Sequence, residues 1–242
     1  MIAIKTENLT KRYGSLTAVD GLNLSIREGE LFSLLGVNGA GKTTTIKMLT
    51  CLSAPTSGDG YIMGNSITRD AQKVKSLIAV SPQETAVAKA LTVRENLELI
   101  CGVYGFDRAR REHKIAELVR LMNLKSVLER KAGKLSGGWQ RRLSIAMALI
   151  SQPQVLFLDE PTLGLDVIAR SELWDIIRAL KGKVTIVLTT HYMEEAEALS
   201  DRIGIMRDGR LLVCDTAQNI RQQAGSDSFE QAFVRIVRGD VR

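Results

Sequence analysis

A glycine-rich stretch at residues 36–44 has the residue types and spacing of a phosphate-binding loop, G-x-x-x-x-G-K-[ST]. Glycines let successive backbone N–H groups turn inward around a phosphate, and the N-terminus of a following helix, expected over residues 45–52, adds a positive dipole end. Lys42 can then reach the outer phosphates of a nucleotide, and the Thr43 hydroxyl can ligate Mg²⁺. The predicted phosphate-binding residues are Gly36, Asn38, Gly39, Ala40, Gly41, Lys42, Thr43 and Thr44.

Two neighbouring carboxylates follow a short apolar segment later in the chain. Residues 155–158 are all apolar, as expected for a parallel strand buried on both faces, and Asp159 and Glu160 come directly after them. Ligands of open α/β sheets bind beyond the carboxyl ends of the strands. Asp159 is therefore placed to hold Mg²⁺, directly or through water, and Glu160 to polarise an attacking water. The alternative is two merely solvated acids, which the phosphate-binding loop disfavours.

A third group, Ser-Gly-Gly at residues 136–138, leads into a helix expected over residues 143–150. This pattern resembles the signature motif of the ABC-type ATPases. The resemblance covers residues 13–214, nearly the whole chain, and looks most like the drug- and lipid-exporter branch. The order of motifs is also similar to theirs: the phosphate-binding loop, Gln83, the signature residues, Asp159 with Glu160, and then His191.

The resemblance implies that two such domains pair head to tail. The signature residues of one domain then contact the γ-phosphate of ATP held by the loop of the other. A serine hydroxyl, exposed backbone N–H groups and a helix N-terminus suit that role. An ordinary helix cap would explain Ser136 but not Gly137 and Gly138, each costly within a helix. Asp166 resembles the aspartate of the family's inter-subunit loop, and it can also cap the following helix.

The resemblance implies roles for three residues that would mean little alone. Tyr13 would stack on adenine, Gln83 would touch Mg²⁺ or the attacking water, and His191 would contact the γ-phosphate. The alternatives are a tyrosine on an exposed turn, an ordinary loop glutamine and a surface histidine. ATP is thus the implied nucleotide and Mg²⁺ its cofactor. The predicted catalytic residues are Lys42, Gln83, Glu160 and His191, and the predicted metal ligands are Thr43, Gln83 and Asp159.

Three places depart from the family's usual residues. Val37 stands where proline is common, Trp139 where glutamine is frequent, and Leu163 with Val167 where serine and proline are usual. None of these residues replaces a catalytic group, so the resemblance implies a site that can hydrolyse ATP. Glu160 is the preferred general base, because His191 is better suited to donate a hydrogen bond.

The elements that must position these residues alternate between strands and helices. Helical spacing dominates residues 90–149, where Thr92 with Glu95 predicts a capping box and Asp107 a second cap. Residues 226–242 predict an amphipathic helix packed on the chain's own body. The expected strands are residues 30–35, 58–63, 78–80, 155–158 and 184–188, and residues 203–206 and 211–214 are expected to form a hairpin.

The predicted fold is α/β: a P-loop NTPase core with a mainly parallel sheet, an antiparallel β subdomain and an inserted α-helical subdomain. The expected ATPase domain covers residues 1–220 and is followed by a short helical tail, residues 221–242. Within the domain, residues 1–85 and 151–220 form the expected nucleotide-binding core and residues 86–150 the helical subdomain. By resemblance, that subdomain docks onto a separate transmembrane permease subunit.

Composition narrows the setting. Hydrophobic residues make up 45% of the 242 residues, enough for a soluble core. No apolar run approaches the roughly 18–20 residues needed to span a bilayer, and the first residues lack the pattern of a secretion signal. Three scattered cysteines favour reduced thiols. We therefore expect a cytoplasmic protein that is peripheral on the inner face of the cell membrane.

The net charge of +6 is concentrated in one segment. Residues 107–142 hold eleven Lys or Arg and four acidic residues, giving +7 and leaving −1 for the rest. Such a segment can face anionic lipid or nucleic acid, and the alternative is a solvated helix face.

The predicted function is that of an ATP-binding and hydrolysing subunit of an ABC transporter, of the exporter kind. It would act as an ATP-dependent homodimer or as a heterodimer with a related subunit, with no nucleic-acid partner. A soluble ABC-type ATPase acting on nucleic acid or ribosomes is the alternative, which the basic segment keeps open. A GTPase lacks support because no Asn-Lys-x-Asp sequence occurs, and intact Glu160 and His191 argue against a non-hydrolysing heterodimer member.

Overall fold

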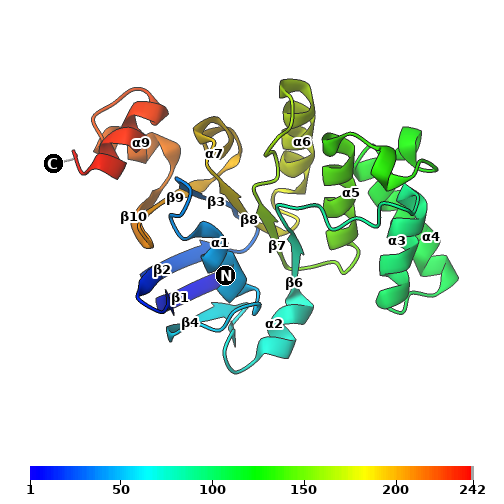
Figure 1. Ribbon diagram of the computed structural model, residues 1–242, viewed down its shortest axis with the longest axis horizontal. Coiled ribbons are helices and arrows are strands. Elements are labelled where there is room, and N and C mark those ends of the chain that lie inside the picture. The colour runs from blue at the N-terminus through cyan, green and yellow to red at the C-terminus, as the bar shows by residue number, and fades with distance from the viewer. Residues whose placement is uncertain (241–242) are drawn as a thin grey trace.

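A six-stranded sheet lies at the centre of the computed structural model, which describes residues 1–240 (Figure 1). The strand order is β10-β9-β3-β8-β7-β6, and all neighbouring pairs are parallel except β9 with β10. Its strands are β3 (Leu31–Gly36), β6 (Ile78–Ser81), β7 (Val155–Asp159), β8 (Thr185–Thr190), β9 (Arg202–Arg207) and β10 (Arg210–Asp215). Every residue of β3, β7 and β8 is buried, as expected for strands covered on both faces.

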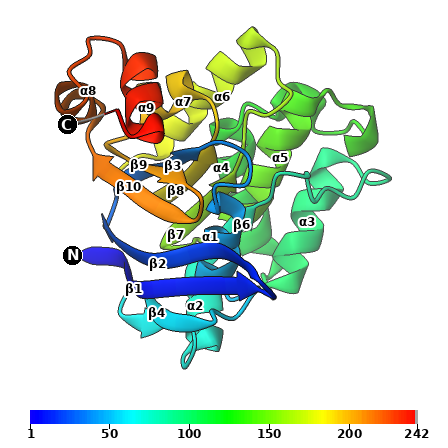
Figure 2. The same cartoon turned by 60° about the vertical axis from the view of Figure 1, so that its left-hand side comes forward.

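A smaller antiparallel sheet lies beside the first, in the order β2-β1-β4-β5 (Figure 2). Its strands are β1 (Ile2–Tyr13), β2 (Leu16–Arg27), β4 (Ser57–Ile62) and β5 (Asn65–Ser66). The sequence pattern predicted an antiparallel subdomain but did not single out the first two strands. The β1–β2 pairing shifts register four times, and Asn8 has a positive φ of 48°. These irregularities break the two-residue alternation that reveals a strand in sequence.

Helices cover both faces of the parallel sheet, and a further group of helices lies to one side of it (Figure 1). The helices of the core are α1 (Lys42–Leu49), α2 (Ala71–Leu77), α6 (Val167–Leu180) and α7 (Met193–Leu199). Between β6 and β7 come α3 (Val93–Val103), α4 (Arg108–Leu121) and α5 (Gly137–Leu149), with short 3₁₀ turns at Lys125–Val127 and Ala132–Lys134. The predicted fold class, with its inserted helices, is confirmed.

Two of the inserted helices, α3 and α4, begin where the sequence predicted. Thr92 and Glu95 form both hydrogen bonds of a capping box, and Asp107 accepts a hydrogen bond from the backbone N–H of Arg110. Two helices begin earlier than predicted, however: α1 at Lys42 rather than residue 45, and α5 at Gly137 rather than residue 143. The glycines and polar residues of their first turns conceal the helical period.

The chain ends in two short helices that pack against β9, β10 and α7. These are α8 (Ala217–Gln223) and α9 (Phe229–Arg238). Phe229 and Phe233 are buried in a cluster with residues of β9, and Val237 packs against it, so α9 lies on the chain's own body as predicted. Residues 241 and 242 of the predicted tail lie outside the described residues. Within residues 1–240, no helix combines the length and apolar character needed to cross a bilayer.

Candidate active site

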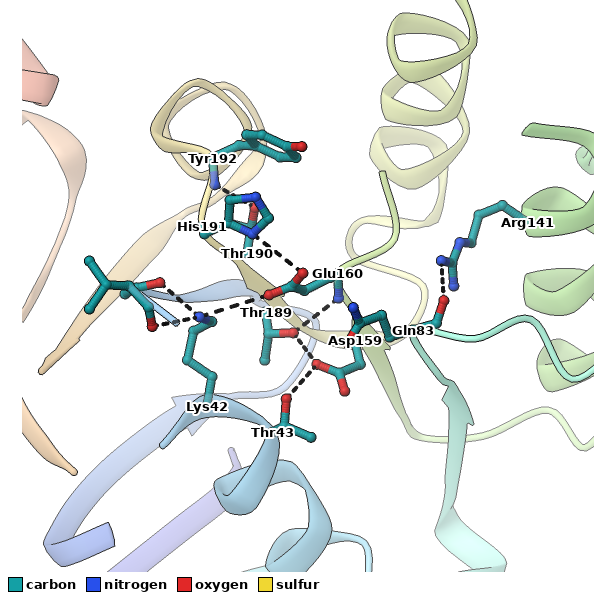
Figure 3. Close-up of polar contacts among 12 residues, drawn as sticks. Lys42, Thr43, Gln83, Arg141, Asp159, Glu160, Thr189, Thr190, His191 and Tyr192 are labelled. Carbon is teal, nitrogen blue, oxygen red and sulfur yellow. Dashed lines mark hydrogen bonds and ion pairs between the residues drawn. The ribbon is translucent and has the colours of Figure 1, made fainter. Parts of the chain in front are cut away.

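A cleft of about 740 Å³ lies at the carboxyl ends of the parallel strands (Figure 3). The phosphate-binding loop between β3 and α1 forms one wall, and residues that follow β6, β7 and β8 form another. The cleft is lined by Tyr13, residues 38–44, Gln83, Glu160 and His191, among others. Tertiary folding thus gathers residues that lie up to 195 positions apart, from Tyr13 to Asp208, around one cleft.

The loop conformation depends on two glycines. Gly41, at the start of α1, has φ = 102°, a conformation that residues with a Cβ rarely adopt. A Cβ at Gly36 would lie 2.4 Å from the carbonyl oxygen of Met206 on the neighbouring strand. These glycines let the backbone curl tightly against β9, which leaves the inner side of the loop open to the cleft.

Lys42 is held inside this curl. Its Nζ donates hydrogen bonds to the carbonyl oxygens of Gly36, at 2.7 Å, and Val37, at 3.2 Å, and its side chain is only 5% exposed. Burial lowers the pKa of Lys42, and the negative charges of Glu160 and Asp159 partly offset that effect. The ammonium group therefore lies where the oxygens of a bound phosphate could replace its carbonyl partners.

Oxygen ligands gather at the base of the cleft. Thr43 Oγ1 donates to Asp159 Oδ1 at 3.4 Å, and Thr189 Oγ1 donates to the same oxygen at 2.5 Å. Asp159 is buried at the end of β7 and Thr43 lies in the first turn of α1 (Figure 3). A carboxylate and a hydroxyl side by side are hard oxygen ligands of the kind that Mg²⁺ prefers, and Mg²⁺ takes its other ligands from water and phosphates. The residues therefore fit the predicted metal.

Glu160 is held in a strained backbone conformation just beyond β7. Its φ is 46°, and its N–H donates to the carbonyl oxygen and the hydroxyl of Thr189, at 3.1 and 3.0 Å. Its carboxylate lies 3.9 Å from Lys42 Nζ and 3.3 Å from His191 Nδ1 (Figure 3). The two hydrogen bonds from its N–H to Thr189 fix the backbone of Glu160, and the carboxylate then lies between Lys42 and His191. This is the position expected of a group that polarises an attacking water.

The signature residues lie outside this cleft. Ser136 precedes α5, and its hydroxyl makes no capping hydrogen bond, so the helix-cap alternative does not account for it. A Cβ at Gly138 would lie 3.1 Å from Cβ of Ala169, which shows how closely α5 approaches the first turn of α6. Asp166 caps α6 by accepting from the Ala169 N–H at 2.9 Å. The Ser-Gly-Gly segment and the turn at Asp166 are therefore neighbours, and Ser136, Gly137 and Asp166 are exposed without lining the cleft.

The structure adds contacts that the sequence did not reveal. Arg141 on α5 is buried, and its guanidinium donates to the carbonyl oxygens of Pro82 and Gln83 at 2.5 and 2.6 Å (Figure 3). Thr189 joins Asp159 to the backbone of Glu160, as described above. In the sequence, Arg141 is one of the two arginines that follow the signature residues and a charge of the basic segment, and Thr189 belongs to no motif. The residues that Arg141 and Thr189 contact lie far from them in sequence, so only the folded structure could identify these contacts.

The basic segment is partly consumed by such internal contacts. Arg142 is buried, pairs with Glu172 and lies 4.6 Å from the ring centre of Trp139, which gives that residue a packing role. Lys114 is also buried and pairs with Glu117 at 3.0 Å. With Arg141, three of the eleven basic side chains of the segment are buried in contacts within the chain. The solvated-face alternative therefore applies only to the other eight.

The comparisons with known proteins all indicate the same family. The ABC transporter family model matches residues 19–163. A probable multidrug ABC transporter ATP-binding protein of Escherichia coli is 37% identical, over 97% of this chain and 41% of that protein. A daunorubicin resistance ATP-binding protein of Streptomyces coeruleorubidus is 39% identical, over 94% of this chain and 71% of that protein. The chain thus spans less than half of the first relative and about seven-tenths of the second.

A solved structure supports the same conclusion. It is a dimeric, post-hydrolysis state of an ATP-binding cassette bound to ADP and Pi, and its TM-score to this chain is 0.77. The match covers 88% of this chain and 98% of that one at 28% identity. Sequence family, fold and the loop, carboxylate and histidine arrangement agree, and the chain belongs to the ABC transporter family as an ATP-binding protein.

Proposed function

We propose that this chain is the ATP-binding and hydrolysing subunit of an ABC exporter. The observation that carries the proposal is the position of Glu160, held between Lys42 and His191 in the cleft lined by the phosphate-binding loop. A triphosphate threaded through the loop would bring its outer phosphate to these three groups. Tyr13, 48% exposed at the rim of the cleft, is free to stack on the base.

The proposed reaction is an in-line attack of water on the γ-phosphorus of ATP. The bond from the γ-phosphorus to the bridging oxygen breaks, ADP leaves, and Glu160 takes the proton of the attacking water. Lys42 and the loop N–H groups stabilise charge on the phosphate oxygens. His191, whose Nδ1 lies 3.3 Å from the Glu160 carboxylate, would donate a hydrogen bond that orients the γ-phosphate or the carboxylate. Gln83 lines the same cleft and would help to place the water.

Mg²⁺ would be held by Thr43 and Asp159, with Gln83 as a further ligand, and would neutralise developing charge between the β- and γ-phosphates. Thr189 supports this role because its hydrogen bond fixes the orientation of the Asp159 carboxylate.

We further propose that two ATPase subunits pair head to tail and act on a transmembrane permease subunit. The support is the exposed position of Ser136, Gly137 and Asp166 outside the chain's own cleft, since a second subunit can then supply these residues, with the buried Gly138 beside them. The solved relative named above is itself dimeric. Closure on ATP and opening after hydrolysis would move the permease, so the protein would lie against the cytoplasmic face of the membrane.

The predicted division of the chain belongs to the same proposal. Residues 1–85 and 151–220 would act as the nucleotide-binding core, residues 86–150 as the helical subdomain that contacts the permease, and residues 221–240 as a tail. The relatives named for multidrug transport and daunorubicin resistance favour an exporter over an ATPase that acts on nucleic acid or ribosomes.

The variant Glu160→Gln tests the proposal. We expect it to bind ATP and form a stable dimer with ATP and Mg²⁺, seen as a doubled mass in gel filtration with light scattering. Its ATP turnover should fall by about 10²- to 10⁴-fold, the usual contribution of a general base. Glu230→Gln, an exposed acid of α9, is the matched control and should keep wild-type turnover. A Glu160→Gln chain that stays monomeric at saturating ATP and Mg²⁺, or that hydrolyses normally, would contradict the proposal.

A further inference from the structure

Glu195 on α7 is a buried carboxylic acid outside the nucleotide cleft. Its side chain is 1% exposed, although carboxylates are rarely fully buried unless they are paired. Trp174 on α6 donates from Nε1 to Glu195 Oε1 at 3.1 Å. Across residues 1–240, the other carboxylate oxygen, Oε2, finds no hydrogen-bond partner. A buried, half-satisfied carboxylate costs free energy of folding, so it calls for a functional explanation.

A second unsatisfied oxygen lies close to Glu195. The hydroxyl oxygen of Thr162 is buried and also lacks a hydrogen-bond partner within the described chain. Burial raises the pKa of Glu195, and the hydroxyls of Thr190 and Thr162, the Trp174 indole and the Arg170 charge oppose that rise. These groups therefore face the carboxyl group closely enough to stabilise its charged form. A small movement would let the Thr162 hydroxyl donate to the free carboxylate oxygen.

The groups around Glu195 come from segments that carry site residues. Thr162 lies two positions after Glu160, in the loop of residues 161–166 that ends at Asp166. Thr190 directly precedes His191, and its hydroxyl accepts the Tyr192 N–H at 2.9 Å, which shapes the turn that presents the histidine (Figure 3). Helices α6 and α7 lie side by side behind these segments (Figures 1 and 2). One carboxylate thus adjoins the loop, α6 and the histidine turn.

We propose that Glu195 is a positioning residue that ties the loop of residues 161–166 to the turn carrying His191. When nucleotide closes the subunit pair, the Thr162 hydroxyl donates to Glu195 Oε2, and the loop and the histidine become one rigid unit. Glu195 does not touch the nucleotide, and it acts through Thr162 and Thr190. The inference rests on the proposed ATPase function and extends it to a residue outside the cleft.

Two conservative variants isolate this contact. Glu195→Gln keeps one oxygen to accept from Trp174, but its amide nitrogen can only donate to the Thr162 hydroxyl, so the charge-assisted hydrogen bond is lost. Thr162→Val keeps the shape of the side chain and removes the hydroxyl. We expect each variant to lower kcat by about tenfold to a hundredfold, as for a lost hydrogen bond to a charged group. The Kd of a fluorescent ATP analogue should stay within about twofold of wild type, because uniform nucleotide binding is untouched.

The double variant distinguishes positioning from simple stability. If Thr162 and Glu195 act through one shared hydrogen bond, the double variant should be no slower than the slower single variant. Independent structural damage would instead add up, and it would lower Tm in step with kcat. Glu194→Gln, an exposed acid of the same helix, is the matched control and should retain wild-type kcat.

A second measurement does not depend on hydrolysis. The chain has two tryptophans, Trp139 and Trp174, so Trp139→Phe makes Trp174 the single reporter. We expect ATP binding to shift the emission of Trp174 in that background, because the carboxylate beside its indole gains a new partner. Adding Thr162→Val should remove the shift while ATP still binds.

Wild-type kcat in Glu195→Gln and Thr162→Val, or additive effects in the double variant, would overturn the inference and leave the ATPase function intact. If the Trp174 emission does not shift when ATP binds, the inference is also overturned. A wild-type chain that neither binds nor hydrolyses ATP would defeat the proposed function as well. If Glu195→Gln fails to fold, Thr162→Val still decides the matter.

Discussion

Two residues of the cleft sit in states that cost free energy in the absence of nucleotide. Lys42 is a nearly buried ammonium group whose pKa is lowered by burial, and Glu160 holds a left-handed backbone conformation. Strain of this kind persists where the surrounding structure overdetermines it, and it concentrates at functional sites. Thr189 provides that support here, through the two hydrogen bonds it accepts from the Glu160 N–H. The cost of burying the Lys42 ammonium group would be relieved when phosphate oxygens contact it.

Glu195 gives a prediction about stability and pH at the scale of one residue. Its pKa is raised by burial, so the folded state holds the ionised form at a cost that is present above the folded pKa and absent below 4.5. Glu195→Gln removes that cost. We expect the variant to exceed wild type by roughly 1 kcal/mol at pH 8, or about 2–4 °C in Tm. The advantage should shrink to nothing as the pH falls to 4.5.

Thermal melts of both proteins between pH 4 and pH 8 measure this difference directly. Glu194→Gln should show no comparable trend, because Glu194 is largely exposed. A Tm advantage of Glu195→Gln that grows toward acidic pH has the wrong sign and would refute the assignment of a destabilised carboxylate. Together with the expected loss of kcat, the predicted outcome is a variant that is more stable but less active.

At the scale of elements, the contact between α5 and α6 fixes how the signature residues are presented. Gly138 and Ala169 meet so closely that their facing positions must stay small. Gly137, one position earlier, is exposed, and a Cβ there would make only an ordinary 3.5 Å contact with Leu165. The two glycines therefore differ: packing against Ala169 requires a small residue at Gly138, whereas Gly137 is the glycine that we propose approaches a second subunit.

Gly138→Val and Gly137→Ala separate these reasons. We expect Gly138→Val to lower the free energy of unfolding by about 1–3 kcal/mol, because it forces α5 and α6 apart. Gly137→Ala should leave it unchanged or raise it by up to about 1 kcal/mol, through the higher helix propensity of alanine. Urea denaturation measures both values. Equal destabilisation by the two substitutions would show that the close α5–α6 contact does not govern the stability of this region.

At the scale of the whole molecule, each proposed catalytic site needs residues from two chains. Lys42 and Glu160 share one cleft, whereas Ser136 and Asp166 face elsewhere. A chain that lacks Lys42 and a chain that lacks a working signature can therefore complement each other. In a mixed pair, the intact loop of one chain meets the intact signature of the other.

Mixing Lys42→Ala with Ser136→Glu chains tests this arrangement. Each variant alone should be inactive, the second because its carboxylate repels the γ-phosphate. A 1:1 mixture should recover up to about one quarter of wild-type ATP turnover, since half of the pairs are mixed and each has one intact site of two. Lys42→Ala mixed with Glu160→Gln is the matched control and should stay inactive, because neither site of that mixed pair is complete. Recovery in the control, or none in the test mixture, would contradict the head-to-tail pair.

The sequence by itself determined the chemistry and the fold class. Residues 36–44 by themselves indicate a phosphate-binding loop, because glycine, lysine and threonine at this fixed spacing together suit the binding of phosphate. Buried parallel strands such as β7 reveal themselves as continuous apolar runs, and local caps such as Thr92 mark where helices begin. These signals depend only on neighbouring residues, so they can be recognised from the sequence alone.

The tertiary structure decided which residues cooperate across the chain. Arg141 reaches Gln83, Thr189 reaches Asp159, and Glu195 lies beside Thr162, and these pairs are separated by roughly 30 to 60 positions. The pairing of β1 with β2 was hidden for a related reason, since its register shifts depend on the partner strand. Hydrogen bonds and packing between distant segments leave no periodic pattern in the sequence, because these segments come into contact only when the chain has folded.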